Sequence, residues 1–513
     1  MSILTHIAGW PLLAALALVV VPRNYRVIIR AIAVLATLVS AVLAVKMFCQ
    51  FVPNHDGFQF EQQIPWVESL GISYHVGVDG INVGLILMGA IVGFAATLCS
   101  WEIQSREKEF YILLLTMIGG ILGAFASLDL FFFYFLHELA LVPTFIMIGV
   151  WGRGEKKNFA TFQITLYLSA GALIALIGLI ALYLQSGANT FDIPKLLDYV
   201  KAHPISENAQ HLIFPLLLFG FGILVSLWPF HSWAPLGYGV APSPTAMLHA
   251  GVLKKFGLYA LIRIALPMLP ESARCWAQIL AWLCVGNILY VGWVAMRQKD
   301  LNLLIGNSSV AHMGFIFLGI ASLNLIGISG AVLIMIAHGF LAALTFALSG
   351  YIYQQTGTLQ MSELGGLCRK LPFIGTALLM AAMAGCGLPG FANFVGEATV
   401  FFGSWTVFPV VTVIALWGAL VIGGVYMTRA VRNVLHGPLP EKWNSLTDAA
   451  HLWRKLPYAL LLASLFVFGV WPKLLMDKVN PDAEKIVAQI PPAKCCPCPA
   501  LKVAAAENSG VRN

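Results

Sequence analysis

The sequence predicts an all-α polytopic membrane protein of about fourteen transmembrane helices, with two inverted five-helix repeats and two broken helices. Composition predicts the class, because 59% of the 513 residues are hydrophobic, only 10% are charged, and the mean hydropathy is +0.83. A soluble domain carries about 25% charged residues. Apolar runs of about 20 residues, the length that crosses one bilayer, recur along most of the chain.

These apolar runs define the expected spans. The first run is expected to stay as a span rather than be cleaved, because Arg23 and Arg26 follow it and no basic residue precedes it. The expected spans are 7–22, 27–52, 77–100, 110–127, 128–151, 160–185, 212–236, 243–267, 275–296, 303–323, 325–353, 371–403, 406–430 and 456–476.

Lys and Arg residues predict the orientation of the chain. They gather in alternate loops, after the first, fifth and ninth spans and before the twelfth and the last. Such loops lie in the cytoplasm, which places both termini on the outer side. The formal net charge of +7 therefore reflects membrane topology and not nucleic-acid binding.

Spans four to eight and nine to thirteen form two sets of five, which predicts an internal repeat. The fourth member of each set holds a helix breaker, at Ser226–Pro229 in one and at Gly387–Gly390 in the other. We expect five parts: 1–109 with three spans, 110–267 and 268–433 as the inverted repeats, 434–480 as a cytoplasmic loop and the last span, and 481–513 as a flexible tail rich in Cys and Pro.

Ionisable residues deep in apolar runs indicate a chain that moves or senses protons or ions. A charge at that depth is costly unless it pairs or faces a wet cavity, and several at matched depth favour function over a static ion pair. Histidines there suit proton relay near neutral pH. The candidate residues are Glu138, Lys255, His312, His338 and Glu397, with Lys254 and His249 beside Lys255 on the eighth span.

Motifs for bound redox groups are absent from the sequence. There is no phosphate loop, no dinucleotide fingerprint and no Cys series for iron–sulfur clusters. Cys495, Cys496 and Cys498 lie in the tail, where a local metal site or disulfide is one reading and a non-essential segment the other. We therefore expect no cofactor and no metal on this chain, and redox chemistry on partner subunits.

Six motifs, spread over roughly residues 74–400, resemble the antiporter-like chain M (subunit four) of respiratory NADH:quinone oxidoreductase, complex I. They are GVDGI at 77–81, FFFYFLHE at 131–138, PFHSW at 229–233, AGVLKK at 250–255, SSVAHMG at 308–314 and LPGFANFVGE at 388–397. The resemblance implies a proton-translocating subunit in a bacterial cytoplasmic membrane. It implies FMN, iron–sulfur clusters and quinone on partner subunits, and homologous antiporter-like subunits and lipid as neighbours.

The resemblance also assigns roles. Glu138 takes the place of the glutamate of span five, Lys255 that of the lysine of span eight, His312 and His338 those of the central histidines, and Glu397 that of the last proton-handling glutamate.

The sequence departs from the family at the usual partner of Glu138. The lysine of broken span seven falls on Leu224, the WLPDAH motif reads WAPLGY at 233–238, and Asn302 replaces a basic residue. Either Lys254 or His249 substitutes for the missing charge, or the subunit conducts protons differently or not at all. The alternatives to a respiratory subunit are a cation/proton antiporter, a membrane-bound hydrogenase subunit, and a structural spacer that pumps nothing.

Overall fold

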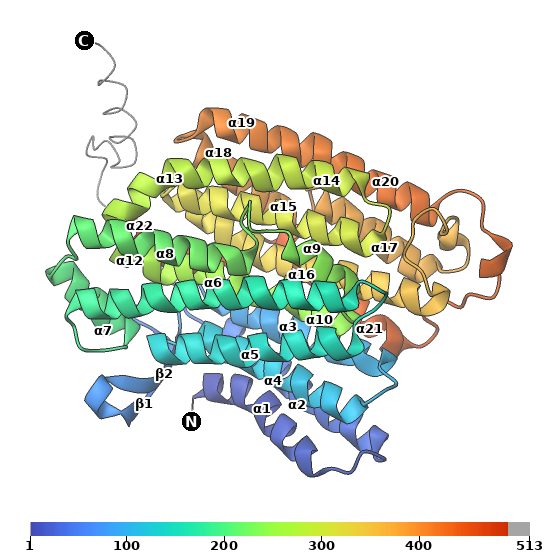
Figure 1. The fold of residues 1–513 in the computed structure, drawn as a ribbon, viewed down its shortest axis with the longest axis horizontal. Helices are drawn as coiled ribbons and strands as arrows, with labels where there is room; N and C mark the ends of the chain where they lie inside the picture. The colour runs from blue at the N-terminus through green and yellow to red at the C-terminus, as the bar shows by residue number, and fades with distance from the viewer. Residues whose placement is uncertain (1, 491–513) are drawn as a thin grey trace.

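A computed structural model describes residues 2–490 as an elongated bundle of helices (Figure 1). Within these residues, twelve helices are long and apolar enough to cross a membrane. They are α1 (Ile3–Val20), α2 (Arg26–Gln50), α3 (Val83–Cys99), α4 (Glu107–Ala126), α5 (Leu130–Trp151), α6 (Lys157–Ser186), α8 (Glu207–Val225), α13 with α14 (Pro270–Val285, Val291–Arg297), α15 (Leu301–Ala321), α16 (Leu325–Thr356), α19 with α20 (Pro409–Trp417, Gly424–Leu435) and α21 (Leu452–Val470).

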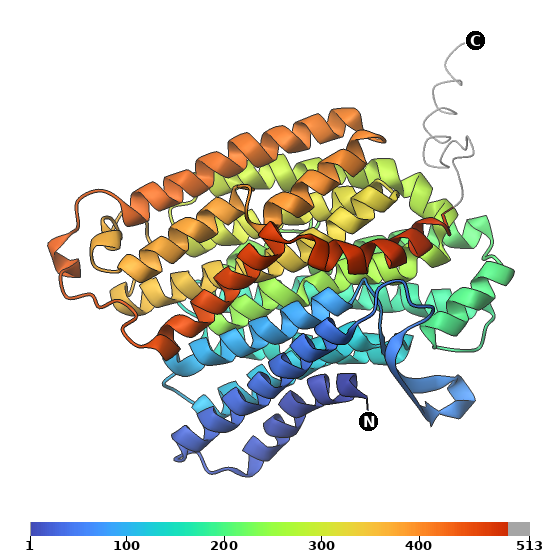
Figure 2. The same cartoon turned by 180° about the vertical axis from the view of Figure 1, so that it is seen from behind.

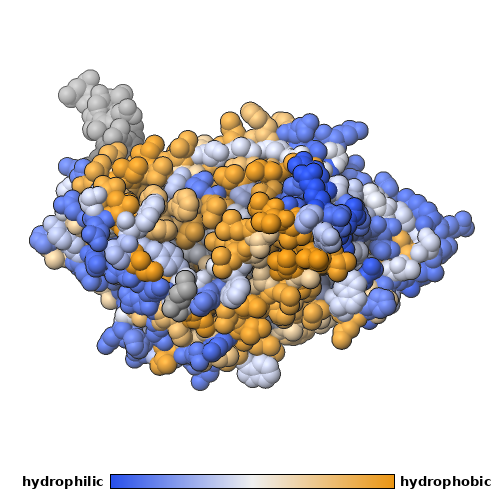
Figure 3. Space-filling model, turned by 90° about the horizontal axis from the view of Figure 1, so that it is seen from below, coloured by the Kyte–Doolittle hydropathy of each residue, from blue (hydrophilic) through white to orange (hydrophobic). Residues whose placement is uncertain are grey.

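Hydrophilic side chains gather at the two ends of the long axis, and hydrophobic ones cover the middle (Figure 3). This distribution is that of a protein whose middle lies in lipid and whose ends meet water. The protein is therefore a mostly helical, multi-pass membrane protein.

Two further apolar segments are interrupted and do not count among the twelve. Residues 243–268 form α10 (Ser243–Leu248), α11 (Lys255–Ala260) and α12 (Leu266–Met268), joined by the π-helical turns η3 (His249–Leu253) and η4 (Leu261–Ala265). The other segment is split into α17 (Pro372–Gly385) and α18 (Ala392–Trp405). Both coincide with predicted spans.

Both predicted helix breaks are present. Helix α8 ends at Val225, the next residue Ser226 has a φ of +74°, and the chain passes the cis peptide Trp228–Pro229 before α9 (Trp233–Val240). The second break, between α17 and α18, places Gly387 at φ +67° and Gly390 at φ +98°. Glycine adopts this left-handed region without a steric penalty, which explains why the break falls there.

The prediction of an all-α fold was wrong for the loop between the second and third spans. Strands β1 (Gln59–Val67) and β2 (Ile72–Val78) form an antiparallel hairpin with Ile64 opposite Tyr74. Residues 72–78 turn alternate side chains to opposite faces of the hairpin, and a count of apolar runs at membrane length does not detect so short an alternation.

Short helices outside the spans were not predicted either. Helix α7 (Ile193–Ala202) lies in the loop before α8, and α22 (Lys473–Val487) follows the last span. The last span therefore ends at Val470, and residues 481–487, predicted as part of a flexible tail, are helical. The remaining elements are π-turns η5 (Gly286–Tyr290) and η7 (Gly418–Gly423) and the 3-10 turns η1 (Glu68–Leu70), η2 (Ser100–Glu102), η6 (Leu367–Arg369) and η8 (Glu441–Trp443).

The C-terminal helices close the back of the bundle (Figure 2). Helix α21 packs on α3 and α16, and α22 packs on α16. Asp482 of α22 accepts a hydrogen bond of 2.7 Å from the backbone N–H of Gly80, and Lys478 and Lys485 donate to the carbonyl oxygens of Phe51 and His55. The N-terminus, the hairpin, α7 and α22 consequently lie at the same end of the molecule (Figure 1).

Candidate functional site

Four of the predicted residues lie together in the middle of the bundle: Lys255, His338, His312 and Glu397. All four are buried, and Lys255 is fully enclosed. Its ammonium donates hydrogen bonds of 2.8 Å to Nδ1 of His338 and 2.6 Å to the carbonyl of Ala250. A lysine enclosed in apolar surroundings needs such acceptors, because an unpaired ammonium there is very costly.

A π-helical turn shapes the backbone around Lys255. In η3 the N–H of Lys254 bonds to the carbonyl of His249, five residues back, at 3.0 Å. Such turns are rare and often mark functional sites. The turn directly precedes Lys255 and contains Ala250, whose carbonyl accepts one hydrogen bond of the ammonium.

The two central histidines connect Lys255 to Glu397. The rings of His312 and His338 are 5.4 Å apart between centroids. Nδ1 of His312 lies 2.7 Å from the carbonyl of Ser308 and donates to it, which leaves Nε2 as the ring nitrogen for a second contact. That Nε2 faces Glu397, with 3.7 Å between it and Oε1. Lys255, His338, His312 and Glu397 thus follow one another through the middle of the bundle, and we call these four residues the central series.

The helix break positions Glu397. Its side chain is 6% exposed, and Oε1 has no hydrogen-bond partner among the described residues. A Cβ placed on Gly387 would lie 2.5 Å from Oε2 of Glu397. Gly387 is therefore required twice, for its positive φ and for the space that the carboxyl group occupies.

Lys254 and His249 lie beside the central series and not in it. The Lys254 ammonium lies 3.4 Å from Oγ of Ser309 and 5.6 Å from the centre of the Tyr238 ring. His249 stacks on Trp233 with 5.5 Å between ring centroids. Both residues are buried, and they face α9 and α15.

Glu138 corrects one expectation. Its position in the middle of a long apolar run predicted a carboxylate without access to the surface, yet its side chain is 30% exposed. The nearest ionisable side chain is His137, with 3.3 Å between Nδ1 and Oε1, and the described residues contain no lysine within ion-pair distance of Glu138. Leu224 is 4% exposed, so an apolar side chain occupies the position of the expected lysine.

His137 lies between Glu138 and the interior of the bundle, and it was not among the predicted site residues. It is buried, and its ring stacks on Phe256 with 4.0 Å between centroids. Phe256 directly follows Lys255 in the chain. The adjacency of His137 to Glu138 was visible in the sequence, but the direction in which each side chain points was not.

A second polar cluster, at the end of the bundle that holds the hairpin, was missed. His75 of β2 lies between Asp192 and Glu61, at 2.8 Å from Nδ1 to Oδ2 and 2.6 Å from Nε2 to Oε1. Burial disfavours the charged imidazolium, but the hydrogen bonds and charges of these two carboxylates outweigh it and raise the pKa of His75. This cluster ties the hairpin to the start of α7.

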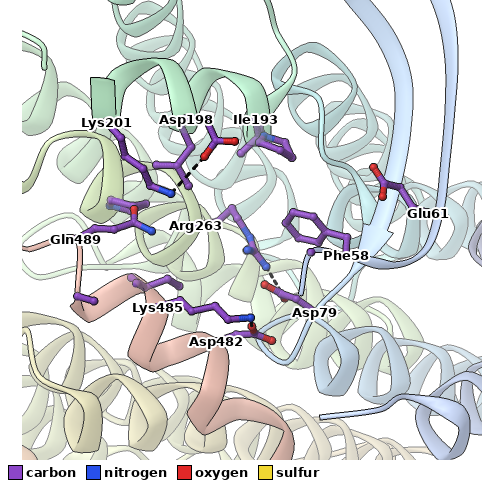
Figure 4. Close-up of a pocket in the computed structure, with 16 residues that line it drawn as sticks. Phe58, Glu61, Asp79, Ile193, Asp198, Lys201, Arg263, Asp482, Lys485 and Gln489 are labelled. Carbon is purple, nitrogen blue, oxygen red and sulfur yellow. Dashed lines mark hydrogen bonds and ion pairs between the residues drawn. The ribbon is translucent and has the colours of Figure 1, made fainter. Parts of the chain in front are cut away.

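A cavity of about 670 Å³ opens at the same end, between the hairpin loop, α7 and α22 (Figure 4). Each basic residue that lines it is paired: Arg263 with Asp79 at 2.5 Å, Lys485 with Asp482 at 2.9 Å and Lys201 with Asp198 at 3.3 Å. Only the pair of Arg263 and Asp79 joins segments far apart in the chain, since the other two pairs lie within α22 and α7. None of the four residues of the central series lines this cavity.

The described residues contain no group of three or more His, Cys, Asp or Glu side chains that could hold a metal ion. Cys495, Cys496 and Cys498 lie outside the described residues.

This fold is that of an antiporter-like membrane subunit. Residues 127–423 match the NADH:quinone oxidoreductase/Mrp antiporter transmembrane family. Chain 4 of the NAD(P)H-quinone oxidoreductase of Picosynechococcus sp. is 34% identical, over 95% of this chain and 93% of that relative. The chain belongs to this family, and within it to the chain 4 subunits, as the sequence motifs predicted.

Solved structures agree with this assignment. A chain of the respiratory complex I of Thermus thermophilus superposes with a TM-score of 0.87 at 27% identity, covering 96% of this chain and all of that one. A chain of the Mrp complex of Dietzia sp. shares the fold, with a TM-score of 0.83 at 18% identity over 96% of this chain and all of that one.

Proposed function

We propose that this chain is the proton-translocating membrane subunit of an NAD(P)H:quinone oxidoreductase and that protons pass along the central series. The close succession of ionisable side chains from the Lys255 ammonium to the Glu397 carboxyl is the observation that supports the proposal most strongly. Lysine, imidazole and carboxyl groups can each gain or lose a proton, and buried groups do so in response to neighbouring charge. Quinone reduction elsewhere in the complex would supply that change of charge.

The path begins at Glu138, on the face of α5. A proton taken up there from the cytoplasmic side would reach the interior through His137, pass from Lys255 to His338 and His312, and leave past Glu397. Lys254, with His249 behind it, supplies the buried cation that Leu224 lacks. In support, Lys254 has one weak hydrogen bond and no carboxylate within ion-pair distance among the described residues, so its charge is free to respond.

The membrane arrangement that fits this path has fourteen spans. The two interrupted segments, 243–268 and α17 with α18, would cross the bilayer in addition to the twelve continuous helices. Two inverted repeats, 110–267 and 268–433, are supported by packing at corresponding positions, since α6 packs on α8 and α9, the halves of the first broken span, and α16 packs on α17 and α18, the halves of the second. The even number of spans puts both termini on the same side of a bacterial cytoplasmic membrane, and the loops rich in Lys and Arg on the other side make it the outer side.

The partners that follow are the other membrane-arm subunits, including homologous antiporter-like subunits beside the exposed face of α5. FMN, iron–sulfur clusters and quinone would be bound by partner subunits of the complex and not by this chain. A spacer role is the second candidate, and the absence of a lysine partner for Glu138 favours it.

Proton pumping by membrane vesicles that contain the assembled complex tests the proposal. Glu397→Gln and Glu138→Gln keep the size of the side chain but remove the titratable carboxyl. We expect both to lower the number of protons pumped per quinone reduced. Glu363→Gln, which changes a half-exposed carboxylate paired with Lys442, is the matched control and should pump normally. Normal pumping by both test variants with normal assembly would establish the spacer.

A further inference from the structure

A small cavity lies beside Glu397, between α15, α18 and the span made by α19, η7 and α20. Its volume is about 10 Å³, which is the space of a single water molecule. Three polar side chains line it: His312, Glu397 and Tyr426. Two to four polar partners are what a buried water requires.

The surrounding atoms leave one gap in their hydrogen bonding. Oε1 of Glu397 is buried without a partner, and its 3.7 Å separation from Nε2 of His312 is too long for a direct hydrogen bond. Buried polar atoms are almost always satisfied by protein or by ordered water. A polar contact that is slightly too long, beside a cavity of this size, is the geometry of a water bridge.

Tyr426 is fixed at this cavity by α15. Its hydroxyl lies 3.0 Å from Oγ of Ser308, and the same Oγ lies 3.5 Å from Nδ1 of His312. Tyr426 is 3% exposed and belongs to α20, a helix that contributes none of the predicted site residues. Its hydroxyl can donate to or accept from a water while the Ser308 contact holds it in place.

We propose that this cavity binds one water molecule, that Tyr426 positions it, and that the water joins Glu397 to His312. The proposal rests on the proposed function, in which a proton passes between these two groups. His312 enters the step towards Glu397 as an imidazolium, protonated at both Nδ1 and Nε2. Its Nε2–H bond breaks and the proton passes to the water, while an O–H bond of the water breaks and that proton reaches the carboxylate, which leaves His312 neutral and the water intact. Tyr426 keeps its own proton throughout and is a positioning residue.

Two neighbouring glycines of the same helix allow a direct test. A methyl group on Gly423 would enter the cavity lining, 3.9 Å from the Tyr426 hydroxyl and 3.8 Å from the carbonyl of Gly418, which are ordinary contacts. A methyl group on Gly424 would have no atom within 4 Å. Both glycines have helical φ values of −58°, so alanine is tolerated at each. Gly423→Ala therefore fills the site, and Gly424→Ala is its matched control.

The experiment combines infrared difference spectroscopy with proton pumping on the assembled complex. In the native protein we expect an O–H band of bound water that shifts in H₂¹⁸O, together with a carbonyl band of protonated Glu397 that Glu397→Gln removes. Gly423→Ala should abolish the water band, shift the carbonyl band and slow pumping roughly tenfold, since a misplaced proton carrier costs at least that much. Tyr426→Phe should shift the carbonyl band, and Gly424→Ala should change nothing.

The inference is overturned if Gly423→Ala and Tyr426→Phe both match Gly424→Ala in bands and pumping. That result leaves the proposed function standing as long as Glu397→Gln still stops pumping. Normal pumping by Glu397→Gln would instead overturn the role of Glu397 itself, whatever the water band shows.

Discussion

Lys255 and His338 share one hydrogen bond of 2.8 Å in the middle of the bundle, although they belong to different helices. An ammonium only donates, so Nδ1 of His338 must accept and the imidazole must be neutral when Lys255 is charged. Two positive charges at this distance in a buried site repel strongly. The pair therefore holds one positive charge at a time, and a proton that arrives at His338 displaces the charge of Lys255.

The first prediction concerns Lys255→Met. Pumping should be lost, because the cation of the pair is gone. Stability should stay within about 1 kcal/mol, because the removal of a buried charge offsets the hydrogen-bond partner lost by His338. Vesicle pumping and the thermal unfolding midpoint of the purified complex measure the two effects. Lys442→Met, at a half-exposed surface lysine, is the control, and pumping by Lys255→Met at the control rate would contradict the charge-displacement model.

The second prediction separates backbone strain from steric contact at the helix break. Gly387→Ala and Gly390→Ala each place a side chain at positive φ, which costs about 1 kcal/mol. Only the Cβ at residue 387 collides with Glu397, while the one at residue 390 has no atom within 4 Å. We expect both variants to lower the unfolding midpoint and only Gly387→Ala to impair pumping. Equal pumping by the two would mean that the position of the Glu397 carboxyl is not critical.

The third prediction asks whether Lys254 replaces the lysine that is absent at Leu224. Lys254→Met should abolish pumping if its ammonium carries the missing charge. The double variant Leu224→Lys with Lys254→Met should then recover part of the activity, because it restores one buried cation on a neighbouring helix. His249→Gln in the same pumping assay tests His249, the second candidate for the missing charge. Full activity of Lys254→Met would assign Lys254 to packing against Tyr238.

The fourth prediction is that the attachment of the hairpin to α7, through His75 and Asp192, depends on pH. His75 has a raised pKa, so its contribution to stability is complete below its ordinary pKa of 6.5 and is lost as the pH rises through the raised value. Although burial opposes ionisation of Asp192, hydrogen bonds from His75 and Lys195 N–H lower its pKa, so its contribution is complete above 3.8 and is lost as the pH falls through the lowered value. The hairpin should be held most firmly between these limits.

Amide hydrogen exchange of residues 72–78, corrected for the intrinsic effect of pH, measures this attachment. The groups that face His75 are Glu61, Asp192 and, through Asp192, Asp129 and Lys195. Protection should fall as the medium becomes alkaline, and His75→Asn should flatten the profile. A profile in the native protein that is already flat would show that the imidazolium does not hold the hairpin.

The helix breaks could be predicted from sequence because their signal is local. Gly387, Pro389 and Gly390 lie within four residues of one another, and a cluster of such residues disfavours a regular helix more than a single proline does. Pro143 lies inside α5 without breaking it. The membrane class and most spans were predictable for a similar reason, since a run of about 20 apolar residues has the length of a helix that crosses the bilayer. The buried histidines and Lys255 were found because a charge in an apolar run is conspicuous.

The direction of Glu138 could not be predicted in the same way. Helix α5 is apolar on every face, so no periodic pattern distinguishes the side that packs inward from the side that faces out. Only the packing of α4 and α6 against α5 decides that Glu138 stays partly exposed while His137 is buried. Tyr426 was missed because a tyrosine within an apolar helix carries no formal charge, and the hairpin because its strands are shorter than a span.

The contacts between α22 and the loop at residues 51–80 have a consequence for biosynthesis. Gly80 and Asp482 are 402 positions apart in the chain. At ribosomal rates of about 5–20 residues per second, roughly 20 to 80 seconds separate the synthesis of Gly80 from that of Asp482. During that interval the loop at residues 51–80 lacks its contacts with α22. A chain that stops before Pro472 never forms these contacts. This end of the subunit is therefore completed only when translation ends. After premature termination we expect the loop at residues 51–80 to be open to membrane proteases.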